Sequence, residues 1–512
     1  MPGPYVELML LLREQAQLTS VYNLLSWDQE TGMPPRTAGP RAEQLSLVAR
    51  LAHESGTSPR IGELLDLCDQ DFDTGDDERN QRRQANLREI RRDYEKGLKL
   101  PPSLVAEISE TSSRAMEVWK VAREQADFDT FAPLLEKQLE LTRKKAELLG
   151  TPKGGEAYDA LLDEYEPGMT AVDVEAMFAP LRRELAPLIS AISESGHAPD
   201  QTANEIPFPL DAQQVFNARV SERLGFSFDA GRFAVSVHPF STGIAPFDTG
   251  ITTRYSETQF AEALGSTMHE VGHGLYEQGL PKDKYWGQPL SESLGLGIHE
   301  SQSRLWENHV GRSLPFWRWC LPFARETLGS ALDGLTADDV HRTINTVRPH
   351  PIRVESDEAT YNLHIMIRFD LERAMFRGEL AVADLPDAWN ARMESDLGLM
   401  VENDTQGCLQ DIHWSMGSIG YFPTYTLGTL YAAQFWETLC EQLDDVDGSM
   451  ERGEFDGILD WLRRHIHGLG RRTPSAQLCH DLTGKPLGHG PLMRHLTHKY
   501  GEIYGLGDDF SS

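Results

Sequence analysis

Long stretches of the N-terminal third place apolar side chains at helical spacing, and this pattern constrains the fold more than any other feature. The stretches span residues 5–25, 35–54, 83–97, 101–125 and 128–149, and charged residues occupy their other faces. Apolar residues that recur every three or four positions are typical of helices that bury one face. The sequence therefore predicts a mainly α-helical protein.

Two short segments depart from this pattern. Residues 232–240 alternate in polarity and are rich in β-branched and aromatic side chains, and residues 251–255 follow a connection that contains glycine and proline. Alternation with β-branched residues indicates strands. We expect a small β-element near residues 230–255 in an otherwise helical chain.

A polar, proline-containing stretch at residues 196–210 precedes the change from helical to strand-like patterns. Such stretches mark exposed connections. We therefore expect a single catalytic unit spanning 1–512, with an N-terminal helical lobe at 1–200 and a second lobe at 201–512.

The charge balance limits the classes of partner. The chain has 79 Asp and Glu against 48 Lys and Arg, a formal charge of −31. Such a surface repels nucleic-acid phosphates and anionic lipid, so we expect neither nucleic acid nor membrane as a partner. Five scattered cysteines, no secretory signal and no apolar run of membrane-spanning length predict reduced thiols and a cytoplasmic location.

The stretch at residues 255–281 carries the strongest local signals. Ser256 and Gln259 have the spacing of a capping box, which predicts a helix start, and Gly279 followed by Pro281 predicts its end. A His-Glu-x-x-His pattern lies between these signals, inside the predicted helix.

His269 and His273 are four residues apart and therefore lie on one face of that helix, with Cβ atoms about 5–6 Å apart. Their imidazoles can bind one metal ion at about 2.0–2.1 Å. Glu270 flanks the ion and can take a proton from a water that the metal activates, then pass it to the leaving amine. A chance pattern on a buried helix is the alternative, so a third ligand is needed.

A second predicted helix, at residues 291–311, contains Glu300. Two histidines with one glutamate leave the fourth position open, which is the arrangement of catalytic zinc sites. Spacing alone leaves three rivals to Glu300 as the third ligand, namely Glu292, His299 and Glu307.

Motifs along nearly the whole chain resemble those of the M32 metallocarboxypeptidases, the carboxypeptidase Taq family. They are WDQETGMP (27–34), RAEQL (41–45), HPF (238–240), the His-Glu-x-x-His helix, HESQSR (299–304), IRVESD (352–357), GCLQDIHW (407–414), TGKPL (483–487) and KYGEIYG (499–505).

The resemblance implies a large helical peptidase with a deep active-site groove between two lobes, commonly a homodimer, which removes single residues from peptide C-termini. In HESQSR the glutamate after the histidine is the third metal ligand, which corresponds to Glu300. Zn²⁺ is the expected cofactor, although two histidines and one carboxylate also accept Co²⁺ or Mn²⁺.

The chain departs from the family pattern at two positions. Gly250 replaces the arginine of D-x-R-x-T, and Ser356 replaces the alanine of I/V-R-x-x-A-D. Both motifs are tied to the limit on substrate length and to holding the chain end, so the length preference is open. Arg254 is a candidate replacement for the missing guanidinium.

A carboxypeptidase needs a cation for the terminal carboxylate of its substrate, and the arginine fork matches two oxygens. Arg353 follows two prolines that make the backbone extended, and the family motif favours it over Arg348. The structural alternative is that Arg353 pairs with Glu355 or Asp357.

Hydrolysis also needs donors for the oxyanion. The glycine-containing segment 410–428 can supply them, and we assign His413 and Tyr421 to catalysis, with Tyr425 in reserve as a substrate-binding residue. His238, at the end of a predicted strand, is a candidate for lining the cleft. Loop packing and a structural histidine are the alternatives.

We therefore expect a metal-dependent carboxypeptidase of broad specificity that acts on peptides by direct water attack. The alternatives are an oligoendopeptidase-like metallopeptidase and a catalytically silent metal- or peptide-binding protein. Glu270 argues against the silent protein, because a site kept only for binding does not need that base.

Overall fold

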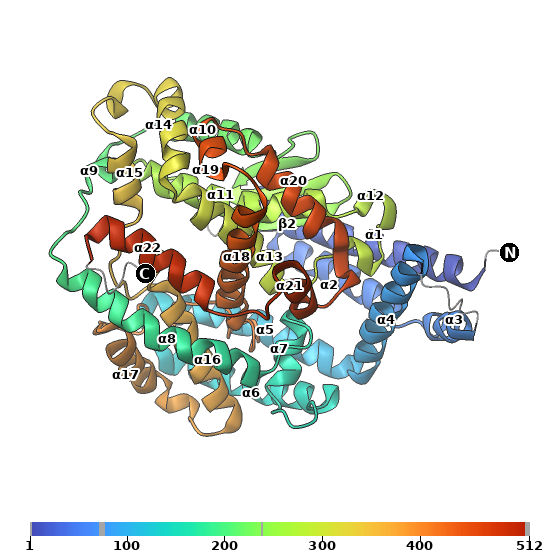
Figure 1. Cartoon of the computed structure of the whole chain (residues 1–512). Coiled ribbons are helices and arrows are strands. Elements are labelled where there is room, and N and C mark those ends of the chain that lie inside the picture. Colours follow the sequence, from blue (N-terminus) through green and yellow to red (C-terminus); the bar gives the residue numbers. More distant parts are fainter. Residues whose placement is uncertain (1–2, 71–76, 237–238, 507–512) are drawn as a thin grey trace.

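The computed structural model describes residues 3–70, 77–236 and 239–506, and helices make up most of it (Figure 1). The α-helices are α1 (Pro4–Thr31), α2 (Ala38–Gly56), α3 (Pro59–Gln70), α4 (Glu78–Lys99), α5 (Pro102–Gln125), α6 (Phe128–Leu149), α7 (Asp159–Tyr165), α8 (Ala171–Glu194), α9 (Thr202–Glu205), α10 (Leu210–Arg223), α11 (Phe260–Gly279), α12 (Lys282–Tyr285), α13 (Leu296–Arg304), α14 (Leu314–Leu328), α15 (Ala337–Ile344), α16 (Tyr361–Arg377), α17 (Leu385–Leu397), α18 (Pro423–Gln442), α19 (Val446–Glu451), α20 (Asp456–His465), α21 (Ser475–Thr483) and α22 (Gly490–Tyr504).

Short helices of other types connect them. The 3₁₀-helices are η1 (Pro35–Thr37), η2 (Pro289–Ser291), η4 (Ser330–Leu332), η5 (Arg353–Glu355), η6 (Val382–Asp384) and η7 (His467–Arg472), and η3 (Leu305–Gly311) is a π-helix that continues α13. The mainly α class is confirmed. In the described ranges, no helix combines the length and the apolar character that crossing a membrane requires.

Helices α1, α2, α4, α5 and α6 correspond to the five predicted ranges, whereas α3 was not predicted. Helix α6 shows why the prediction succeeds. The side chain of Asp127 caps its first turn by accepting a hydrogen bond from the Thr130 amide, and Gly150 ends it with a φ of 94°. Phe131 and Leu135 lie on its buried face. Sequence periodicity and capping residues therefore agree for this helix.

A small sheet occupies the predicted β-region. It contains β1 (Gly231–Val235), β2 (Ser241–Ala245) and β3 (Asp248–Thr253) in the order β1-β3-β2, with β1 parallel and β2 antiparallel to β3. The sheet packs on α11 through β3 and β2. Strand β2 was not predicted, because Ser-Thr-Gly-Ile-Ala has little apolar alternation.

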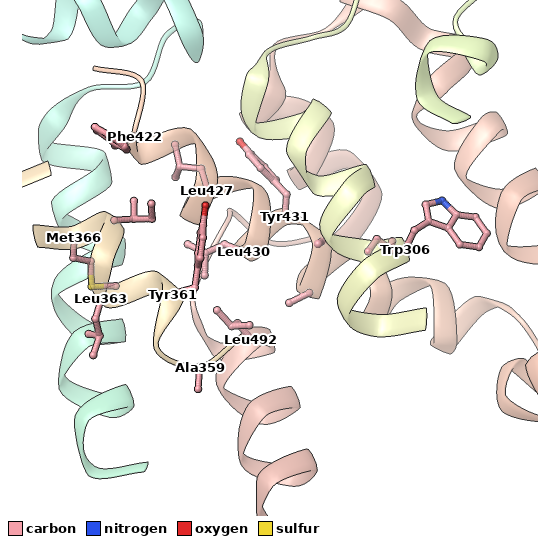
Figure 2. Close-up of a cluster of buried hydrophobic side chains, with 14 of the residues drawn as sticks. Trp306, Ala359, Tyr361, Leu363, Met366, Phe422, Leu427, Leu430, Tyr431 and Leu492 are labelled. Atoms are coloured by element: carbon pink, nitrogen blue, oxygen red, sulfur yellow. The ribbon is translucent and has the colours of Figure 1, made fainter. Parts of the chain in front are cut away.

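One large cluster of buried apolar side chains extends from Ala115 on α5 to Tyr504 on α22. Figure 2 shows part of it, including Leu363 and Met366 of α16 and Leu427 and Leu430 of α18. A separate, smaller cluster belongs to α1, α3 and α4, which lie together at one end of the molecule (Figure 1). The division into lobes at 1–200 and 201–512 is not tested by this packing and stays a prediction.

The capping-box prediction for the metal helix is wrong. Helix α11 begins at Phe260, and Gln259 precedes it in the left-handed region with a φ of 63° and no side-chain cap. Backbone bonds hold the preceding segment against residues 204–208, from the Phe208 amide to the Glu257 carbonyl and from the Gln259 amide to the Asn204 carbonyl. These contacts keep residues 256–259 out of the helix, whereas its predicted end at Gly279 is confirmed.

Candidate metal centre

Helix α11 carries the His-Glu-x-x-His pattern through the middle of the large core. Met268, Val271 and Leu275 are 0–1% exposed and anchor one face of the helix. His269 and His273 lie on an adjacent face, with ring centroids 5.0 Å apart. The helix thus holds both imidazoles on a rigid element, as the spacing predicts.

The structure brings Glu300 of α13 to these two histidines. Its Oε2 lies 3.5 Å from Nε2 of His269 and 3.3 Å from Nε2 of His273. Metal bonds of about 2.0–2.1 Å at tetrahedral angles separate two ligand atoms by roughly 3.3–3.4 Å. The donor atoms of the three residues lie within 4.8 Å of one another, so the set fits a divalent cation.

Two glycines set the distance between the helices that carry these donors. A Cβ on Gly272 of α11 would lie 2.5 Å from the carbonyl oxygen of Gln302 and 2.6 Å from Cα of Ser303. A Cβ on Gly428 of α18 would lie 2.4 Å from Cγ of Glu300. Both glycines allow close approach of α13, and a glycine inside a helical pattern is the sequence signal that could have indicated it.

Two of the rival ligands lie behind the histidines instead of beside the cation position. Nδ1 of His269 lies 2.8 Å from Oε2 of Glu307, and Nδ1 of His273 lies 2.6 Å from Nδ1 of His299. Both imidazoles therefore turn Nε2 toward Glu300. The third rival, Glu292, pairs with an arginine elsewhere, as do several exposed carboxylates.

Further donors fix Glu300. Nε of Arg304 donates to Oε1 at 2.7 Å, and Oγ of Ser303 donates to Oε2 at 2.9 Å. Burial alone would raise the pKa of Glu300, but Arg304 and the two histidines hold that pKa well below its usual range. Glu300 is therefore ionised, as a metal ligand must be.

Glu270 follows His269 and is 6% exposed. Among the described residues its Oε2 has no hydrogen-bond partner. Burial raises the pKa of this carboxyl to about 7. A carboxylate with a free oxygen and a pKa near neutrality can take up a proton and give it back.

Arg353 is buried and already paired. Its Nε and Nη2 donate to Oδ1 of Asp411 at 3.0 and 2.8 Å, and its Nη1 donates to the Tyr361 hydroxyl at 2.8 Å. Asp411 also accepts from Arg368, a contact that spacing did not suggest. Glu355, one of the two expected partners, instead pairs with Arg254.

Asp357, the other expected partner of Arg353, is also used elsewhere. Its side chain accepts from the backbone amides of Arg348, Ala359 and Thr360. Both pairings considered for Arg353 are therefore wrong.

His413, Tyr421 and Tyr425 come together. Nε2 of His413 lies 3.1 Å from the Tyr425 hydroxyl, and the rings of Tyr421 and Tyr425 are 5.4 Å apart. Burial lowers the pKa of His413 to about 3, so this imidazole is neutral. Tyr425 lies in the first turn of α18, which begins at Pro423, so the glycine-containing segment 410–428 ends inside a helix.

A buried carboxylate clamps the segment that carries His413 and Tyr421. Glu372 of α16 accepts hydrogen bonds from Trp414 Nε1 at 2.8 Å, the Gly420 amide at 3.0 Å and the Tyr158 hydroxyl at 2.8 Å. Burial raises its pKa to about 7.

Gly250 leaves room for an aromatic ring. A Cβ at this position would lie 2.5 Å from a ring atom of Trp27, which also packs edge-on against Phe240. Trp27 of α1 therefore occupies the space beside β3. His238 lies outside the described residues.

A cavity of about 750 Å³ lies beside the metal centre. Helices α1, α2 and α4 form one wall, residues between 286 and 296 form another, and Glu277 of α11 contributes to its lining. Glu277 contacts His299 at 2.9 Å, so the cavity reaches to within two side chains of His273.

Residues 7–500 match the sequence model of the carboxypeptidase Taq (M32) metallopeptidase family. The chain belongs to the M32 family. Thermostable carboxypeptidase 1 of Thermus thermophilus is 42% identical to it over 508 residues, 98% of this chain and 99% of that protein. Carboxypeptidase 1 of Bacillus subtilis is 36% identical, covering 97% of this chain and 98% of that protein.

Solved M32 structures share the fold. The M32 carboxypeptidase from Deinococcus radiodurans matches with a TM-score of 0.93 at 38% identity, and Pyrococcus furiosus carboxypeptidase with a TM-score of 0.92 at 35% identity. Each match covers 98% of this chain and 99% of the other. This M32 protein is a metal-dependent carboxypeptidase, and the expected function is confirmed.

Proposed function

We propose that this M32 carboxypeptidase uses His269, His273 and Glu300 to bind Zn²⁺ and releases C-terminal residues from peptides with broad specificity. The convergence of two Nε2 atoms and one ionised carboxylate oxygen beside Glu270 carries the proposal. Once bound there, the cation supplies a Lewis acid that polarises the scissile carbonyl and makes water more acidic.

Glu270 acts as the general base and then as the general acid. Its unpartnered oxygen takes the proton of the attacking water, and the same oxygen delivers it to the leaving amine. A pKa of about 7, raised by burial, suits both steps because neither protonation state is strongly favoured at neutral pH.

Arg353 is assigned to the terminal carboxylate of the substrate. A guanidinium has five N–H groups, and Asp411 and Tyr361 accept three of them. One N–H therefore remains on each terminal nitrogen, and these two can bind both oxygens of a carboxylate. The pairing with Asp411 fixes the orientation of the guanidinium group and leaves these two N–H groups available to the substrate.

His413 and Tyr421 are assigned as donors to the oxyanion, and Tyr425 and His238 as substrate-binding residues. A neutral imidazole and a phenol whose pKa burial raises to about 12 both keep their protons at neutral pH. Donors that stay protonated stabilise developing charge without losing their hydrogen to solvent.

The assignment of Zn²⁺ rests on the ligand set, and Co²⁺ and Mn²⁺ are the alternatives. A cytoplasmic location and a homodimer are part of the same proposal. The location rests on composition, and the dimer rests on likeness to the family.

The test compares matched peptides with a free and an amidated C-terminus. We expect stepwise release of single residues from the free form only, loss of activity after chelation, and recovery with added Zn²⁺, Co²⁺ or Mn²⁺. Internal fragments would support the oligoendopeptidase alternative. Glu270→Gln should lower turnover by roughly 10²–10⁴-fold while metal stays bound. A Glu270→Gln rate equal to that of the wild type would refute the assigned base.

A further inference from the structure

A series of partly buried side chains leads from His273 to the wall of the cavity. Nδ1 of His273 lies 2.6 Å from Nδ1 of His299, and Nε2 of His299 lies 2.9 Å from Oε1 of Glu277. The two imidazole rings are stacked, with centroids 4.5 Å apart. Glu277 in turn pairs with Lys282 through its other oxygen.

These contacts allow one arrangement of protons that leaves His273 able to bind a cation. Nε2 of His273 must keep its lone pair for the metal, so the proton of the neutral ring is on Nδ1. That N–H donates to Nδ1 of His299, which must therefore be unprotonated. The remaining proton of His299 is then on Nε2 and donates to Glu277.

The neighbouring strand β2 leaves space for the ion pair of Glu277 and Lys282. A Cβ on Gly243 of β2 would lie 2.1 Å from Oε2 of Glu277 and 2.5 Å from Nζ of Lys282. The side chains of Glu277 and Lys282 are only 14% and 15% exposed. The sheet edge is thus shaped around the ion pair, which holds Glu277 against His299.

The two histidines of the motif differ in how they are supported. His269 contacts a carboxylate directly, with Oε2 of Glu307 at 2.8 Å. On its Nδ1 side, His273 is connected to a carboxylate, that of Glu277, through a second imidazole. A metal-binding histidine carries its hydrogen on the ring nitrogen that does not bind the metal. A carboxylate or carbonyl that accepts this hydrogen orients the ring and raises the basicity of the other nitrogen.

We propose that His299 and Glu277 are positioning residues that hold His273 with its hydrogen on Nδ1 and its Nε2 directed at the cation. This inference rests on the proposed metal centre. It assigns roles to a residue that the sequence left as a rival ligand and to a residue on the cavity wall. Removing such a partner lowers metal affinity by roughly 10–100-fold.

The test measures Zn²⁺ affinity by competition with a chromogenic chelator, on purified full-length variants. We expect His299→Ala to bind Zn²⁺ 10–100-fold more weakly and Glu277→Ala to bind it about 10-fold more weakly. Glu277→Gln should fall between Glu277→Ala and the wild type, because an amide oxygen still accepts from His299. This graded recovery would not follow from a general loss of stability.

His495→Ala is the matched control. Its Nε2 also lies 2.9 Å from a carboxylate, that of Glu358, and its side chain is 19% exposed against 17% for His299, but it contacts no proposed ligand. We expect its Zn²⁺ affinity to equal that of the wild type. The visible absorption of the Co²⁺-loaded forms should change in His299→Ala and not in this control, since it reports ligand geometry.

His269→Ala separates the two proposals. If it abolishes binding while His299→Ala and Glu277→Ala bind Zn²⁺ as the wild type does, the positioning role is refuted and the metal centre stands. If His269→Ala binds normally, the metal centre itself fails. Should His299→Ala not fold, the series at Glu277 decides the inference alone, because that residue lies one contact further from the metal.

Discussion

Gly428→Ala is a small change that should weaken the metal centre from a neighbouring helix. The added methyl carbon would lie 2.4 Å from Cγ and 2.5 Å from Cβ of Glu300. Carbon atoms in contact are about 3.5–4.0 Å apart, so α18 and α13 must separate by roughly 1 Å or Glu300 must change rotamer. Either response moves the carboxylate relative to the two imidazoles.

The substitution has two effects of opposite sign on the stability of the protein, and it is expected to weaken metal binding. Overpacking costs about 1–3 kcal/mol, whereas replacing glycine by alanine inside a helix contributes about 1 kcal/mol of stability. We therefore expect a net loss of about 0–2 kcal/mol in the free energy of unfolding. A displacement of the Glu300 carboxylate by about 1 Å, compared with a metal–oxygen bond of about 2 Å, should reduce Zn²⁺ affinity by about 10²-fold, by analogy with misplaced catalytic groups.

The assay is chelator competition for Zn²⁺, with thermal unfolding of the metal-free protein measured in parallel. Gly265→Ala is the control, because Gly265 lies in α11 with the histidines and a Cβ there meets nothing within 4 Å. It should gain stability slightly and keep its affinity. If Gly428→Ala keeps wild-type affinity, the argument that this glycine sets the position of Glu300 is refuted.

Two further predictions concern buried charges. Glu372 has a pKa of about 7 in the folded protein against 4.5 when exposed, so the folded state binds more protons between these values and stability falls as pH rises through them. In Glu372→Gln, the decrease in the free energy of unfolding between pH 4.5 and 7.5 should be smaller than in the wild type by roughly 3 kcal/mol. Urea titrations measure this free energy at each pH, and the same pH dependence in both proteins would contradict the prediction. Asp411→Asn removes the negative charge that faces the buried guanidinium groups of Arg353 and Arg368, which should cost about 3–5 kcal/mol in stability. It should also raise KM for free-carboxylate peptides more than it lowers kcat, and an unchanged KM would argue against Arg353 as the carboxylate site.

The parts of the centre that depend on local spacing could be predicted from the sequence. His269 and His273 are one helical turn apart, so their shared face follows from the period of the helix alone. Glu300 could not be chosen in this way, because Glu307 and His299 satisfy the same spacing. The resemblance to the M32 family pointed to Glu300, and of these three residues it is Glu300 that turns its side chain toward both Nε2 atoms.

What the sequence did not indicate depends on contacts between distant segments. Asp411 reaches Arg353 across 58 positions, and Gly428 meets Glu300 on another helix. The start of α11 was misplaced for the same reason, since residues near 204 hold the segment before it by backbone hydrogen bonds that no local pattern reveals. Periodicity predicts which face a helix buries and not which partner it meets.

The separate hydrophobic cluster of α1, α3 and α4 has a consequence for the cavity. Helices α1 and α4, together with α2, form one wall, and polar contacts such as Arg92 with Asp163, as well as the packing of Trp27 against Phe240, join them to the remainder. This wall therefore has an apolar interior of its own, separate from the core to which α11, α13 and α18 belong. Substitutions inside the smaller cluster can therefore reshape the cavity without changing the packing of α11, α13 and α18.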